Sequence, residues 1–231
     1  MGYLAFGNDT KTVKGEAEGV LTGILYLIPD DTLCPMARNA GCREACLVTA
    51  GRGVMSNVKA GRLRKTREFY ADPVAFVDTL KRETRNATKR ATKKGMSLAI
   101  RLNGTSDVPW ENYRGSNGLT LMEQFPDVQF YDYTKLPTRK VPANYHLTVS
   151  YSEANIKYAQ KALKSAHNVA VVFRDAKSIP RVFAGRRVIS GDRTDLRFTD
   201  PKGVVVALYA KGKAKKDTSG FVVDNLIAIG G

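Results

Sequence analysis

The stretch YHLTVSYSEANIKYAQKALKSAHNVAVVFRD, residues 145–175, contains a complete strand–helix–strand unit. Residues 145–151 and 168–175 are short runs rich in β-branched and aromatic side chains, which predict strands. Between them, residues 153–166 carry apolar side chains at helical spacing. Two strands joined by a helix predict parallel neighbours in one sheet, with the helix covering a face of that sheet.

The same alternation extends along most of the chain. It predicts further strands at residues 19–28, 96–104, 128–134, 186–190 and 203–211, and further helices at 56–70, 73–93 and 119–125. Asp72 followed by Pro73 is a strong helix start. Because no repeat or linker divides the sequence, we expect one α/β domain over residues 1–231. The preferred architecture is a partial (β/α) barrel of six or so mainly parallel strands, and an open doubly wound sheet is the alternative.

The charge balance is strongly basic. The 231 residues include 37 Lys and Arg against 22 Asp and Glu, a net charge of +15. Residues 57–94 hold twelve of the basic residues and four acidic ones, and residues 210–216 add four lysines. Such stretches predict affinity for nucleic acid or a nucleotide through the phosphates, although a solvated helix face gives the same pattern. Nothing in the sequence indicates an oligomeric state.

The sequence also predicts a cellular location. No apolar run reaches the roughly 18 residues that a membrane span needs, and the start of the chain lacks the pattern of a secretory signal. We therefore expect a cytoplasmic protein with no membrane partner. Disulfides are rare in that compartment, so clustered cysteines there indicate metal or redox chemistry.

All three cysteines lie in CPMARNAGCREAC, residues 34–46, inside a loop at 29–56 that follows the first predicted strand. In a helical turn, Cys42 and Cys46 would be neighbours about 5–6 Å apart at Cβ, and Cys34 would approach from the preceding loop. Three thiolates predict a [4Fe–4S] cluster with one open iron. Zinc, which usually needs a fourth ligand, and structural or free thiols remain alternatives.

Polar residues follow several predicted strands, at the end where parallel α/β proteins place their chemistry. The candidates for binding a cofactor or substrate are Asn103, Gly104, Asp107, Ser150, Arg174 and Asp192. Structural alternatives exist: Ser150 and Glu153 have the spacing of a capping box, and Asp192 is also typical of a turn. No residue is indicated as catalytic.

The segment LCPMARNAGCREAC resembles the bacteriophage gene product 88 family, whose members carry a Cys-Pro start followed by a C-x3-C pair. A three-cysteine loop after the first strand of a partial barrel is also similar to the radical S-adenosylmethionine (SAM) enzymes, although their spacing is C-x3-C-x2-C. These resemblances imply cluster ligation by Cys34, Cys42 and Cys46, SAM at the open iron, and residues 103–107 near the SAM amino group. They also imply a location in the host cytoplasm.

Two functional hypotheses follow. The first is a radical-SAM-like iron–sulfur enzyme that acts on a nucleotide or nucleic acid. The second is an iron–sulfur protein without turnover, whose cluster is structural or senses redox state while the basic surface binds nucleic acid.

Overall fold

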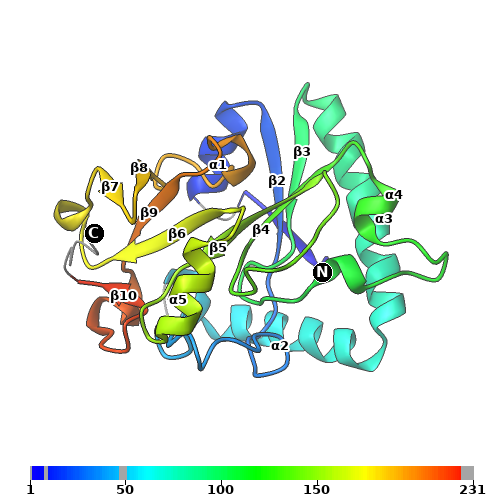
Figure 1. Ribbon diagram of the computed structural model, residues 1–231. Coiled ribbons are helices and arrows are strands. Elements are labelled where there is room, and N and C mark those ends of the chain that lie inside the picture. The colour runs from blue at the N-terminus through cyan, green and yellow to red at the C-terminus, as the bar shows by residue number, and fades with distance from the viewer. Residues whose placement is uncertain (1, 8–9, 47–50, 225–231) are drawn as a thin grey trace.

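A ten-stranded, mostly parallel sheet forms the centre of the molecule (Figure 1). The computed structural model describes residues 2–7, 10–46 and 51–224. The strands are β1 (Leu4–Phe6), β2 (Val20–Leu25), β3 (Ser97–Arg101), β4 (Gln129–Thr134), β5 (Tyr145–Ser150), β6 (Asn168–Phe173), β7 (Val182–Phe183), β8 (Arg186–Ser190), β9 (Val205–Tyr209) and β10 (Val222–Val223). The helices are α1 (Thr10–Ala17), α2 (Ser56–Ala71), α3 (Pro73–Lys93), α4 (Leu121–Gln124) and α5 (Ile156–Leu163).

The strand order is β1-β2-β3-β4-β5-β6-β9-β8-β7, with β10 paired to β6. Strands β2 to β6, β9 and β8 run parallel, whereas β1 and β7 add antiparallel pairs at the two ends. The sheet is open, and the mixed α/β class of a single domain is confirmed. The partial-barrel form stays a prediction.

Each of the seven predicted strands is present, as β2 to β6, β8 and β9. Helix α3 has the predicted bounds. The short elements β1 and α1 were not predicted, and the expected capping box of Ser150 and Glu153 is wrong. Helix α5 begins later, with Asn155 as its N-cap, whose side chain accepts a hydrogen bond from the Tyr158 amide at 3.1 Å.

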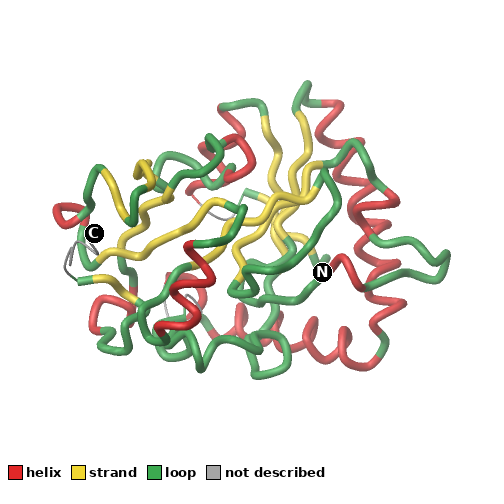
Figure 2. Tube along the Cα trace, in the orientation of Figure 1, coloured by secondary structure: helices red, strands yellow, loops and turns green. Residues whose placement is uncertain are grey.

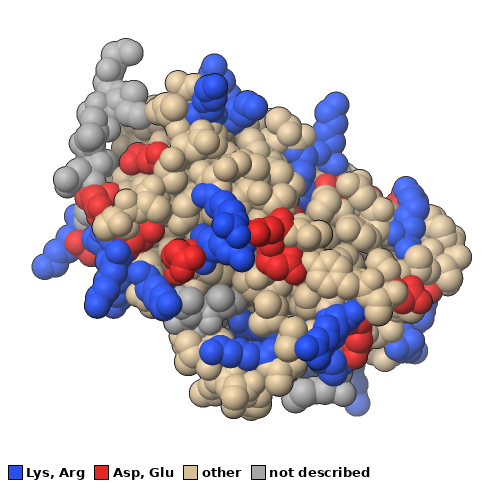
Figure 3. Space-filling model, turned by 90° about the horizontal axis from the view of Figure 1, so that it is seen from below, with Lys and Arg blue, Asp and Glu red and all other residues tan. Residues whose placement is uncertain are grey.

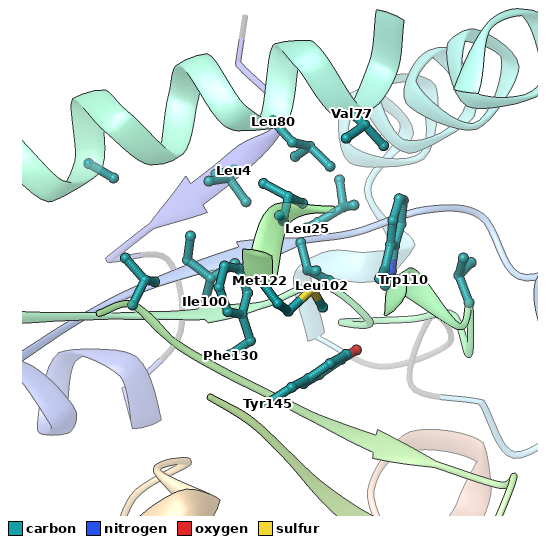
Figure 4. Close-up of a cluster of buried hydrophobic side chains, with 14 of the residues drawn as sticks. Leu4, Leu25, Val77, Leu80, Ile100, Leu102, Trp110, Met122, Phe130 and Tyr145 are labelled. Atoms are coloured by element: carbon teal, nitrogen blue, oxygen red, sulfur yellow. The ribbon is translucent and has the colours of Figure 1, made fainter. Parts of the chain in front are cut away.

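Apolar side chains form two neighbouring cores on one face of the sheet. In the first, Leu80 of α3 packs with Leu25 and Ile100 from the strands, and Trp110 stacks on Phe76 at 6.1 Å (Figure 4). In the second, α5 packs over β5 and β6, and Val149 of this core points to the same face as Leu147 of the first, two residues before it on β5. No helix in the described part of the chain is long and apolar enough to cross a bilayer.

The predicted N-cap of α3 is present and can be tested by substitution. Asp72 caps this helix, and its carboxylate accepts a hydrogen bond from the Ala75 amide at 2.9 Å. We expect Asp72→Ala to lower the free energy of unfolding by about 1 kcal/mol, because one of the first amides of the helix loses its partner. Asp72→Asn keeps an accepting oxygen and should remain close to the parent protein in urea denaturation. Equal losses for the two variants would contradict the cap.

The carboxyl ends of the parallel strands lie along one edge of the twisted sheet, which runs from the bottom to the left of Figure 1. Figure 2 shows that loops, together with α2, make up most of this edge. The cysteine segment, residues 102–110 after β3, residues 135–139 after β4 and the short 3-10 helix η6 (Gly212–Lys216) all contribute to it. The fold therefore gathers most of the candidate residues at one place.

Candidate functional site

The cysteine segment lies at this edge as a series of turns, with no helix at Cys42–Cys46. None of the three cysteines forms a disulfide, and each is partly buried. They are close enough that the charges of Cys42 and Cys46 both contribute to raising the pKa of Cys34. The main cause is burial, which raises the Cys34 pKa to about 12 and also raises the pKa of Cys42. At neutral pH the Cys34 and Cys42 thiols are therefore protonated.

The arrangement corrects the iron–sulfur interpretation. Among the described residues, no group of three or more His, Cys, Asp or Glu side chains could hold a metal ion. The Cys42 thiol donates to the carbonyl oxygen of Ala37 at 3.7 Å. Burial is the largest cause of the raised pKa of both Cys34 and Cys42. Both hypotheses that give the protein an iron–sulfur function are therefore wrong. Binding of SAM stays a prediction.

Lys135 and Asp107 occupy the centre of the edge. The Lys135 ammonium group donates to the side-chain and carbonyl oxygens of Ser150, at 2.7 and 3.0 Å, and lies 4.7 Å from the centre of the Phe221 ring. Asp107 accepts from the Lys135 amide and the Thr134 hydroxyl, both at 2.7 Å. Burial lowers the pKa of Lys135 and raises that of Asp107. The structure thus brings together two predicted residues, Asp107 and Ser150, through a lysine that was not predicted.

A second buried network joins the segments after β3 and β4. Arg139 donates to Glu111 at 2.6 and 2.9 Å and lies 3.5 Å from Asp107. It also donates to the hydroxyl of Tyr145 at 3.3 Å, which in turn donates to Asp132 at 2.6 Å. Asp132 is fully buried, and burial raises its pKa to about 7. These contacts fix the loops that form the edge.

The other predicted cofactor residues of the 103–107 segment make contacts within the chain. The Asn103 side-chain oxygen accepts from the Val108 amide at 2.9 Å and from the Trp110 indole at 3.1 Å. The backbone of Gly104 approaches the end of β2, where a Cβ would lie 2.7 Å from the carbonyl oxygen of Leu25. The close approach that glycine permits here is therefore to the protein itself.

Arg174 and Asp192 lie outside this cluster. Arg174, at the end of β6, pairs with Asp224 and donates to the carbonyl oxygens of Lys215 and Asp217, both at 2.7 Å. These contacts hold the C-terminal part of the described chain. Asp192 follows β8 and lies 4.0 Å from the ammonium group of Lys211. The predicted binding role of these residues stays a prediction.

Two cavities open at the same edge. The larger, about 560 Å³, lies between the end of β2, α2 and η6; the smaller, about 270 Å³, lies between the segment after β4 and α5. Six cations line them: Lys59, Arg62 and Lys213 in the larger, and Lys135, Lys157 and Lys161 in the smaller. No acidic residue of the described chain lines either one. Figure 3, a view from below, shows Lys and Arg spread over this face, with Asp and Glu among them.

The larger cavity brings together the two basic stretches identified in the sequence. Lys59 and Arg62 belong to residues 57–94, and Lys213 belongs to residues 210–216. Charge counts indicated both stretches but not their proximity. The position of Lys135 directly after a buried strand was a weak indication of a site residue. No sequence pattern indicated Arg62, because its burial depends on how α2 packs over the end of β2.

Comparison with known families adds one match. The family model for gene product 88 covers residues 3–225, so the chain is a member of the gene product 88 family, and this supports a bacteriophage origin. Neither the curated proteins nor the solved structures contain a match to the chain. The resemblance to the radical SAM enzymes has no support from any of these comparisons.

Proposed function

We propose that this protein binds nucleic acid or a nucleotide at the carboxyl edge of its sheet, in the cytoplasm of the infected host. The observation that carries the proposal is the lining of the two cavities, where six cations meet no described acidic residue. A concave surface with one sign of charge attracts phosphates and retains them by releasing counterions. The net charge of +15 acts in the same direction.

Three features support the edge as the binding surface. Parallel α/β sheets bind ligands outside the carboxyl ends of their strands. Lys157 and Lys161 are exposed one helical turn apart on α5, beside the buried Lys135. The networks around Asp107 and Arg139 satisfy the buried acids internally, so these acids do not neutralise the exposed lysines.

The test is the salt dependence of binding to a labelled single strand. We expect the double variant Lys157→Gln, Lys161→Gln to bind more weakly and to reduce the slope of log K against log salt by about 1.4, because two phosphate contacts are lost. The matched control is Lys93→Gln, Lys202→Gln, which removes two exposed lysines at the amino edge of the sheet. Equal effects of the two double variants would overturn the assignment to the carboxyl edge.

A further inference from the structure

Arg62 differs from the other buried arginines of the described chain. Arg101 pairs with Asp195 at 2.9 Å, Arg139 with Glu111 at 2.6 Å and Arg197 with Asp200 at 3.1 Å. Arg62 is only 9% exposed, and it makes no ion pair with any residue the structure describes. Burying an unpaired charge is costly, so the fold keeps an unfavourable group at this position.

The guanidinium of Arg62 also has unused donors. Its Nε and Nη1 atoms are buried and have no hydrogen-bond partner in the described chain. Its central carbon lies 4.9 Å from the centre of the Tyr26 ring, a contact that orients the guanidinium without supplying an acceptor oxygen. Burial lowers the pKa of Arg62, and Tyr26 and Cys46 act in the opposite direction. An arginine stays charged even so, which leaves a cation in need of an anionic partner.

Arg62 lines the larger cavity, and the rest of the lining indicates what this partner is. Lys59 and Lys213 add two cations, so the site suits a group with more than one negative charge. Ile28, Pro29, Val54 and Leu63 supply apolar walls. At about 560 Å³, the cavity falls in the size range of small-molecule sites. Its lining therefore suits an amphiphilic anion, with a phosphate for the cations and a flat or apolar part for the walls.

We propose that this cavity binds the phosphomonoester of a nucleotide, with Arg62 as the principal phosphate ligand. A phosphomonoester carries close to two charges and presents several acceptor oxygens, and Arg is suited to pair with it through two parallel hydrogen bonds. The choice of a nucleotide rests on the proposed function. The source is either a free nucleotide or the terminal phosphate of a strand. An internal phosphodiester carries a single charge and satisfies the three cations less well.

The experiment compares two single strands of one sequence, labelled at the 3′ end, that carry either a 5′-phosphate or a 5′-hydroxyl. We expect the parent protein to bind the phosphorylated strand about tenfold more tightly, as a charge-assisted pair implies. Arg62→Met should abolish this preference, so that the variant binds the two strands with equal affinity. Arg62→Lys should retain part of the preference. The pair Lys157→Gln, Lys161→Gln should weaken both strands equally.

Calorimetry with a nucleoside 5′-monophosphate, the matching nucleoside and inorganic phosphate shows whether the site binds a free nucleotide or only the terminal phosphate of a strand. Binding of the monophosphate to the parent protein but not to Arg62→Met supports the site even if no strand binds, an outcome in which only the nucleic-acid part of the proposed function fails. Salt-dependent binding of both strands without a 5′-phosphate preference, and with no monophosphate binding, overturns this site and leaves the proposed function standing. Inorganic phosphate binding as tightly as the monophosphate overturns the nucleotide class.

Stability provides an independent readout. Because Arg62 is a buried charge with no acidic partner among the described residues, Arg62→Met should unfold at the same or a higher urea concentration than the parent protein. A residue retained for structure would show a lower midpoint. A clear loss of stability in Arg62→Met, together with an unchanged strand preference, would show that the arginine serves the fold and would overturn the proposal.

Discussion

Replacing Arg139 with Met is expected to lower the free energy of unfolding by about 3–5 kcal/mol, the usual cost of removing one partner from a buried ion pair. The Arg139 side chain is 5% exposed, and the carboxylates of Glu111 and Asp107, which are 11% and 9% exposed, both lie within its reach. Methionine fills similar space but leaves these two acids without their cation. Urea denaturation of the parent protein and the variant measures the loss.

Two controls show whether burial causes this effect. Arg114→Met removes an arginine from an exposed pair with Glu123, where both side chains are at least 40% exposed, and should cost less than about 1 kcal/mol. Adding Glu111→Gln to Arg139→Met removes one unpaired charge and should recover part of the loss. Similar costs for Arg139→Met and Arg114→Met would contradict the description of this network.

Asp132 is expected to make the protein less stable as pH rises from about 4 to 7. Burial raises its pKa from 3.8 to about 7, so in this window the folded protein holds a proton that the unfolded chain has released. A proton bound more tightly by the folded state stabilises it at low pH, and this stabilisation is lost as pH rises through the folded pKa. The full effect is about 4 kcal/mol, at 1.36 kcal/mol for each pKa unit.

The measurement is the difference between the parent protein and Asp132→Asn in urea unfolding at several pH values. A difference is needed because His146 acts in the opposite direction: burial lowers its pKa to about 4, so its contribution to stability increases as pH rises from 4 toward 6.5. We expect the parent protein to lose stability relative to Asp132→Asn over this range. A difference that does not vary with pH would show that Asp132 is ionised throughout.

Much of the fold could be predicted from local patterns. The seven longer strands lie where short runs of apolar, β-branched and aromatic residues predict them, and α3 begins where Asp72 and Pro73 indicate. The antiparallel strands β1 and β7 could not be predicted, because two or three residues carry too little periodicity to be distinguished from a loop. The start of α5 is capped by Asn155 and not by the Ser150–Glu153 pair, because the helix begins only at Ile156.

The candidate site was harder to predict, because its chemistry depends on burial and on contacts between distant segments. Three neighbouring cysteines predicted a metal centre, but their position in sequence does not give the geometry of their sulfurs. Lys135 and Arg62 are indicated as binding residues by the structure, in which each lines a cavity together with other cations. The binding role of Asn103 stays a prediction, and its side-chain amide donates to the Val108 carbonyl and the Asp132 carboxylate within the chain.

The most direct test of phosphate binding is the affinity of the unmodified protein for a short single strand at two salt concentrations. Contact with at least three phosphates gives a slope of log K against log salt of about −2 or steeper, so we expect affinity to fall more than about tenfold between about 50 and 200 mM salt. Fluorescence anisotropy on a labelled strand measures this. Failure to bind at the lower salt concentration, or the same affinity at both, would contradict phosphate recognition by this protein.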